Sequence, residues 1–180
     1  SSDTVMITGA GPVGLGGVVN AKYRGARTIS VERVPYRMEK AKELGADLVL
    51  NPDDPNIRVE IMSFTNGVGV DACVETSGTL EAQRLCIDVV RRKGQVALVG
   101  ECGEDLAIKA SPDFIRKGIV LMGQWHYNLN GTFKIMKVIR ESPVVDKLIT
   151  HVFPMSRIQE ALEISASHEC AKIILNPWEN

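Results

Sequence analysis

The feature that most constrains the fold is an alternation of short apolar runs with stretches of helical spacing. The runs are rich in β-branched residues and nearly continuous, as strands buried on both faces are. They cover residues 4–8, 28–32, 47–51, 71–75, 95–100 and 118–123. Helical spacing fills the intervals at 12–24, 36–44, 56–65, 79–92 and 111–116. Strands joined by helical crossovers pair in parallel, so we predict a doubly wound α/β fold with a parallel six-stranded Rossmann sheet.

The pattern changes near Gly131. The elements predicted beyond it are a helix near 131–141, a break at Ser142-Pro143, an extended run at 147–154, a helix near 156–167 and a strand at 171–177. We therefore predict two parts. Residues 1–142 form the Rossmann domain, and residues 143–180 form a C-terminal strand-helix-strand return segment.

Composition narrows the classes of partner and compartment. The 180 residues include 21 basic and 22 acidic ones, and neither sign forms a long block, which argues against nucleic-acid and membrane partners. No cleavable leader or long apolar run is present, so we expect a cytoplasmic protein. The cysteines lack metal-site spacing and are expected to be buried thiols; they are Cys73, Cys86, Cys102 and Cys170. Because the chain starts at Ser1, we expect a piece of a longer protein.

Three glycines follow the first predicted strand in the pattern G-x-G-x-x-G. In a dinucleotide fold, Gly9 makes the tight turn, Gly11 lets a pyrophosphate approach the backbone, and Gly14 lets the helix pack against the strand. Pro12 presets the first helical turn, and Val13 then offers an amide to the anion. The alternative is an ordinary strand-to-helix turn.

Glu32 closes the second predicted strand, 18 residues after Gly14. A carboxylate near that offset binds the adenosine ribose hydroxyls. A 2′-phosphate about 4 Å away would be repelled by roughly 4 kcal/mol at an effective dielectric of about 20, so NAD is favoured over NADP. Arg33 and Arg37 complicate this preference, because a guanidinium can stack on adenine or grip a 2′-phosphate. Both arginines are equally well explained as solvated surface residues.

Two further loops follow carboxyl ends of strands, where ligands of open α/β sheets bind. Residues there are expected to face the nicotinamide half of the cofactor, unless they are ordinary turn residues. They are Thr76, Ser77 and Gly78 after the fourth strand, and Val99, Gly100 and Glu101 after the fifth.

Several segments in order resemble the cofactor domain of the zinc-type medium-chain dehydrogenase/reductases, a family that includes alcohol, sorbitol and threonine dehydrogenases. These segments are "GAGPVGLGG", "SVER", "AKELGAD", "VDACVETSG" and "KGQVALVG". The tail "FPMSRIQEALEISASHECAKIIL" resembles the return segment that packs on the catalytic domain of that family.

The resemblance implies roles for individual residues. Val13 would contact the pyrophosphate, Glu32 the ribose and Arg37 the adenosine end, while Lys172 would reach the pyrophosphate or remain a surface lysine. The function implied is the cofactor-binding portion of an NAD-dependent alcohol or polyol dehydrogenase. Zinc ligands and proton relay would lie in a catalytic domain ahead of Thr4, so this chain alone is expected to be inactive.

Other interpretations remain open. The chain could be a freestanding NAD-sensing regulatory module; a methyltransferase is disfavoured because the sixth strand reads as parallel. His126, His151 and His168 are expected to be structural rather than metal ligands. The family commonly dimerises through its sixth strand, and the apolar run at 118–125 predicts a homodimer of that kind.

Overall fold

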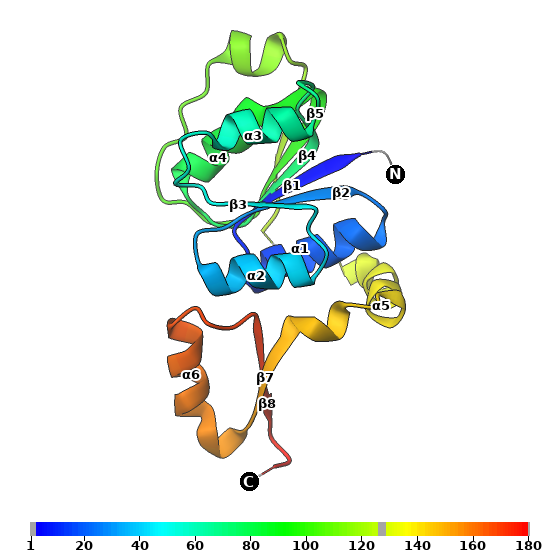
Figure 1. Cartoon of the computed structure of the whole chain (residues 1–180), viewed down its shortest axis with the longest axis vertical. Helices are drawn as coiled ribbons and strands as arrows, with labels where there is room; N and C mark the ends of the chain where they lie inside the picture. The colour runs from blue at the N-terminus through cyan, green and yellow to red at the C-terminus, as the bar shows by residue number, and fades with distance from the viewer. Residues whose placement is uncertain (1–2, 126–128, 180) are drawn as a thin grey trace.

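The computed structural model describes residues 3–125 and 129–179. Within them, a parallel six-stranded sheet has the order β3-β2-β1-β4-β5-β6 (Figure 1). Its strands are β1 (Thr4–Thr8), β2 (Arg27–Val31), β3 (Leu48–Leu50), β4 (Val70–Glu75), β5 (Val90–Leu98) and β6 (Val120–Gly123). The chain order reverses between β1 and β4, which places a topological switch point there. The predicted doubly wound α/β fold is confirmed.

Helices cover both faces of this sheet (Figure 1). The helices α1 (Pro12–Tyr23) and α2 (Pro35–Glu43) lie on one face, and α3 (Ile57–Phe64) and α4 (Leu80–Val89) lie on the other. Successive side chains of a strand point to opposite faces, so neighbouring residues of β1 enter different cores. Met6 belongs to the cluster under α3 and α4, whereas Ile7 packs with Leu15 of α1.

The boundary between α4 and β5 differs from the prediction. The helix ends at Val89, and the expected continuation to residue 92 was wrong. Val90 instead pairs with Val70 of β4, and the register then shifts before Gln95. At Gly94 a Cβ would lie 2.9 Å from the Asp71 carbonyl oxygen, so glycine suits this irregular part of the strand pairing. The segment predicted at 111–116 is a π-helical turn, η1 (Ala110–Ile115).

The helix α5 (Thr132–Glu141) lies near α1 (Figure 1), and its Val138 packs against the apolar cluster that contains Leu15. The elements after it form a smaller lobe (Figure 1), which consists of the 3-10 turn η3 (Val145–Leu148), β7 (Ile149–Pro154), α6 (Ile158–Ala166) and β8 (Lys172–Asn176). The strands β7 and β8 pair in parallel as a separate sheet. Val144, Leu148 and Ala171 pack into the same apolar cluster as Leu15 of α1. Packing therefore crosses the predicted boundary after residue 142.

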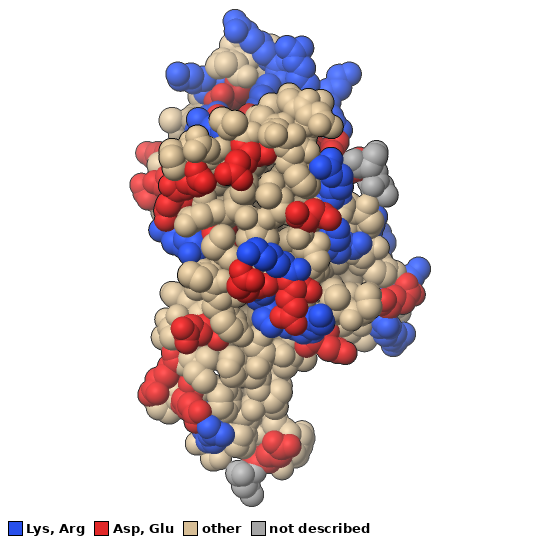
Figure 2. Space-filling view, viewed as in Figure 1, with Lys and Arg blue, Asp and Glu red and all other residues tan. Residues whose placement is uncertain are grey.

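Charged side chains of both signs are mixed over much of the face in Figure 2, with basic ones gathered at the end where η1 lies. Within the described part of the chain, none of the helices combines the length and apolar character that a bilayer crossing requires. Cys73, Cys86 and Cys170 are buried free thiols, whereas Cys102 is half-buried, contrary to the expectation that all four would be buried.

Candidate functional site

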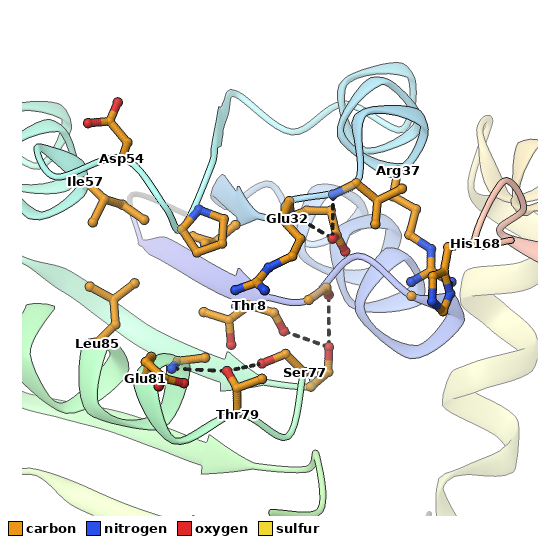
Figure 3. Close-up of a pocket in the computed structure, with 18 of the residues that line it drawn as sticks. Thr8, Glu32, Arg37, Asp54, Ile57, Ser77, Thr79, Glu81, Leu85 and His168 are labelled. Carbon is orange, nitrogen blue, oxygen red and sulfur yellow. Dashed lines mark hydrogen bonds between the residues drawn. The ribbon is translucent and has the colours of Figure 1, made fainter. Parts of the chain in front are cut away.

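A cleft of about 660 Å³ lies at the carboxyl ends of β1, β2 and β4 (Figure 3). The loops that follow these strands meet there, as the strand order requires. The predicted site residues that line it are Gly9, Gly11, Glu32, Arg33, Arg37, Thr76 and Ser77. The structure thus brings together residues that are up to 68 positions apart in the sequence, counting from Gly9 to Ser77.

The glycine loop has the geometry expected for close contact with a ligand. Gly9 adopts a φ of +81°, and a Cβ there would lie 2.9 Å from the Ser77 backbone N. A Cβ at Gly14 would lie 1.7 Å from the Gly9 carbonyl oxygen, so only glycine lets α1 start this close to β1. At Gly11 no protein atom lies within 4 Å of the Cβ position. This side of the loop backbone is open to a ligand.

Glu32 lies just after β2 and is 7 % exposed. Its Oε2 accepts a hydrogen bond from Ala10 N at 2.7 Å, and its Oε1 accepts from Arg33 N at 2.8 Å and Val34 N at 3.0 Å. The carboxylate therefore ties the glycine loop to the end of β2. A carboxylate has about four lone-pair positions, so acceptor capacity remains for a ligand in the cleft.

A second acid, Glu75, was not singled out from the sequence. It ends β4 fully buried, and its Oε1 accepts from Ser77 N at 2.7 Å, from Ser77 Oγ at 2.6 Å and from Gly78 N at 2.9 Å. Within the described residues, its Oε2 has no hydrogen-bond partner. Glu75 thus fixes the conformation of the loop after β4. An acidic residue at the last position of a predicted strand is the sequence signal for Glu75, as it is for Glu32.

The threonine of the same loop joins it to β1. Thr76 Oγ1 donates to the carbonyls of Thr8 and Gly9, at 2.8 and 3.0 Å. On the other side, a Cβ at Gly78 would lie 2.3 Å from Glu101 O, and one at Gly100 would lie 2.3 Å from Gly78 N. These two glycines let the loops after β4 and β5 touch directly, so the three loops form one packed unit.

Other predicted residues lie outside the cleft lining. They are Pro12, Val13, Gly14, Gly78, Val99, Gly100, Glu101 and Lys172. Pro12 and Val13 begin α1, where Val13 is exposed, and Lys172 is an exposed residue at the start of β8. Instead of Lys172, the return segment contributes His168 to the cleft, with Nδ1 3.4 Å from Arg37 Nη2.

His151 lies in different surroundings from His168. The ring of His151 is stacked on that of Phe153 at a centroid distance of 6.0 Å, and neither lines the cleft. His126 lies outside the described residues. In the part of the chain that the structure describes, no group of three His, Cys, Asp or Glu could hold a metal ion.

The cleft is chemically graded from one end to the other. Figure 3 shows the apolar Ile57 and Leu85 at one end, with Asp54 and Glu81 near them. Arg37 and His168 lie at the other end, and Glu32 lies between. An apolar end suits a flat heterocycle, an acid suits a sugar diol, and open loop amides with cationic side chains suit a phosphate. Ile57 belongs to α3 and Leu85 to α4, two helices in which the sequence predicted no site residue.

Comparison with known proteins gives a consistent picture. A family model described as zinc-binding dehydrogenase matches residues 12–141. An L-threonine 3-dehydrogenase from Symbiobacterium thermophilum is 31% identical over 178 residues, which is 97% of this chain and 51% of that protein. The chain therefore spans about half the length of the curated relatives it matches.

Solved structures share the fold over a similar range. An alcohol dehydrogenase from Thermotoga maritima superposes with a TM-score of 0.89 at 33% identity, covering 97% of this chain and 50% of that one. A short chain alcohol dehydrogenase from Escherichia coli, complexed with the cofactor NADH, has a TM-score of 0.84 over 97% of this chain and 52% of that one. Its 23% identity shows the shared fold alone.

Proposed function

This chain belongs to the zinc-binding dehydrogenase family, and we propose that it is the cofactor-binding portion of an NAD-dependent, zinc-type alcohol or polyol dehydrogenase. In such an enzyme, hydride leaves the carbon that bears the hydroxyl group of a primary or secondary alcohol and is taken up by the nicotinamide ring. The observation that carries the proposal is one cleft lined by both the open backbone at Gly11 and the carboxylate of Glu32.

The site fits a dinucleotide in its donors and its space. The amides at the start of α1 and the positive end of the helix dipole would bind the diphosphate, because a Cβ-free surface at Gly11 allows phosphate to approach. Adenine would lie between Ile57 and Leu85 at the apolar end. The loops with Val99, Gly100 and Glu101 would lie toward the nicotinamide, as their packing against Gly78 supports.

NAD is the proposed cofactor rather than NADP. Glu32 is held in place by three backbone hydrogen bonds, so it cannot swing away from a 2′-phosphate without breaking them. The fixed negative charge would repel that phosphate, whereas the ribose hydroxyls of NAD would donate to it. Arg33 would be less available to bind a 2′-phosphate, because it forms an ion pair with Asp53, with Nη2 3.5 Å from Oδ1.

The catalytic machinery would come from sequence outside this chain. We propose that zinc, the residues that bind it and the proton relay belong to a further domain of the full protein, which matches the half-length coverage of the relatives. Its packing would cover the exposed apolar side chains of α5, among them Phe133, Met136 and Ile139. The relatives named as acting on threonine or alcohols support a hydroxyl-bearing substrate.

A homodimer through β6 completes the proposal. This strand is the last in the sheet order, and its Val120 and Met122 side chains are exposed. An apolar edge strand of this kind is suited to pair with a second copy across a two-fold axis.

Titration calorimetry of the chain with NAD and with NADP tests the proposal. We expect saturable binding of NAD, weaker binding of NADP, and no NADH formation when an alcohol is added. Binding of NADP as tight as that of NAD would contradict the role given to Glu32. Failure to bind either dinucleotide would contradict the cofactor site itself.

A further inference from the structure

The return segment places a histidine in the wall of the cofactor cleft. His168 follows α6 and adopts a φ of +64°, a conformation that residues other than glycine rarely take. Such a backbone is strained and persists where the surrounding structure enforces it. Among the described residues that line the cleft, His168 is the only one beyond Leu85.

Packing of the adjacent residues fixes this position. Cys170 and Ala171 are 3 % and 2 % exposed, and Ala171 shares an apolar cluster with Ala10 of the glycine loop. The segment that carries His168 is therefore anchored against the phosphate-binding loop of the proposed site. The buried neighbours therefore hold the backbone of the exposed His168 at the cleft.

The contact with Arg37 decides which ring nitrogen is available. Arg37 Nη2 lies 3.4 Å from His168 Nδ1. A guanidinium can only donate, so Nδ1 accepts this hydrogen bond and the proton of the neutral ring lies on Nε2. Within the described residues, Nε2 makes no hydrogen bond to the protein, and the buried Nε of Arg37 also lacks a partner. The Nε2–H of His168 and the remaining N–H groups on the outer nitrogens of the Arg37 guanidinium are thus left for a ligand, since Nε itself is buried.

The position of the pair in the cleft identifies the group that it would bind. Figure 3 shows Arg37 and His168 at the end opposite Ile57 and Leu85, with Glu32 between. If adenine occupies the apolar end and its ribose lies at Glu32, the next group along the cofactor is the diphosphate. Neighbouring N–H donors, one of them on a cation, match phosphate oxygens.

We propose that His168 Nε2–H and the guanidinium of Arg37 form a clamp that binds the cofactor diphosphate from the side opposite the glycine loop. The inference rests on the proposed dinucleotide function and adds to it a binding residue from the return segment. Arg37 would then bind the diphosphate rather than the adenosine end, the role that the resemblance implied for it. Because Lys172 does not line the cleft, His168 takes the role for which the sequence suggested that lysine. The bound cofactor would then join the return segment to the sheet.

The substitution His168→Gly tests the clamp in the 180-residue chain. Glycine adopts the positive φ without strain, so the variant is expected to fold at least as stably. Loss of one hydrogen bond to a phosphate should raise the dissociation constants of NAD, NADP and ADP-ribose about tenfold in titration calorimetry. Adenosine, which lacks phosphate, should bind both proteins equally.

Lys93→Gly is the matched control, because Lys93 also has a positive φ, of 59°, and does not line the cleft. It should relieve the same kind of strain without changing any dissociation constant. Equal NAD affinity of His168→Gly and the unsubstituted chain would overturn the clamp and leave the cofactor function standing. A loss confined to NADP would also overturn it, since His168 would then contact the 2′-phosphate. An unsubstituted chain that binds no dinucleotide would refute the proposed function itself.

Discussion

The substitution Gly11→Ala should separate cofactor binding from folding. Gly11 has a φ of −69° and a ψ of −177°, which alanine adopts without strain. The added Cβ would meet no protein atom within 4 Å. We therefore expect the free energy of unfolding to change by less than about 0.5 kcal/mol.

The effect on binding should be much larger. The methyl group would occupy the space through which phosphate oxygens reach the loop amides at about 2.9 Å. Loss of two such charge-assisted hydrogen bonds, at about 1.5 kcal/mol each, corresponds to a dissociation constant for NAD raised about 100-fold. Titration calorimetry measures the affinity, and thermal unfolding measures the stability of the same preparation.

Two neighbouring glycines provide the controls. Gly14→Ala would place its Cβ 1.7 Å from the Gly9 carbonyl oxygen, so it should lower the free energy of unfolding. We expect a loss of about 3 kcal/mol, which lowers Tm by roughly 6–12 °C in a chain of this size. Gly16→Ala meets no atom within 4 Å and lies inside α1, so it should add about 0.5–1 kcal/mol and leave NAD binding unchanged. Unaltered NAD affinity in Gly11→Ala, or a Tm loss equal to that of Gly14→Ala, would refute the reasoning.

Three acids give further tests. Glu32→Gln should raise the affinity for NADP relative to NAD at least about tenfold in paired titrations, because a neutral amide no longer repels the 2′-phosphate; an unchanged ratio would contradict this. Glu75→Ala removes a fully buried carboxylate, leaves the amide and hydroxyl of Ser77 without their acceptor and should cost about 3 kcal/mol in urea unfolding, and a cost under about 1 kcal/mol would argue against its positioning role. The hydrogen-bonded Arg84 guanidinium lowers the pKa of the Asp113 carboxyl to about 2, so its contribution is complete above the unfolded pKa of about 3.9 and is lost as pH falls toward about 2. Asp113→Asn should flatten the stability curve in that acid window, and a curve parallel to that of the unsubstituted chain would exclude the contribution.

The strands of the sheet could be predicted from the sequence because burial on both faces makes each an apolar run. The end of α4 could not, since the run from Cys86 to Val90 suits a helix and a strand equally well. The helix ends at Val89 because Val90 pairs with Val70 of β4. This contact joins residues distant in the sequence, so a local sequence pattern does not reveal it. Similarly, the positive φ of Gly9 follows from a motif, whereas that of His168 depends on how the return segment packs.

The candidate site divides in the same way. The glycine loop and Glu32 lie next to one another because adjacent parallel strands end at one edge, which the alternation of elements already implies. Ile57, Leu85 and His168 line the cleft only because α3, α4 and the return segment pack where they do. Lys172 was predicted as a pyrophosphate contact from the resemblance alone. His168, four residues earlier, lines the cleft instead.

The hydrogen bonds of Glu32 mean that cofactor preference and loop geometry cannot be varied independently. One oxygen accepts from both Arg33 N and Val34 N, and the other accepts from Ala10 N. A glutamine that keeps its carbonyl toward the first pair turns its NH₂ toward the Ala10 N–H, so two donors face each other and the glycine loop loosens. Affinity for both dinucleotides should then fall, since both bind the same loop. The ratio of NADP to NAD affinity, rather than either value alone, therefore isolates the electrostatic contribution of the carboxylate.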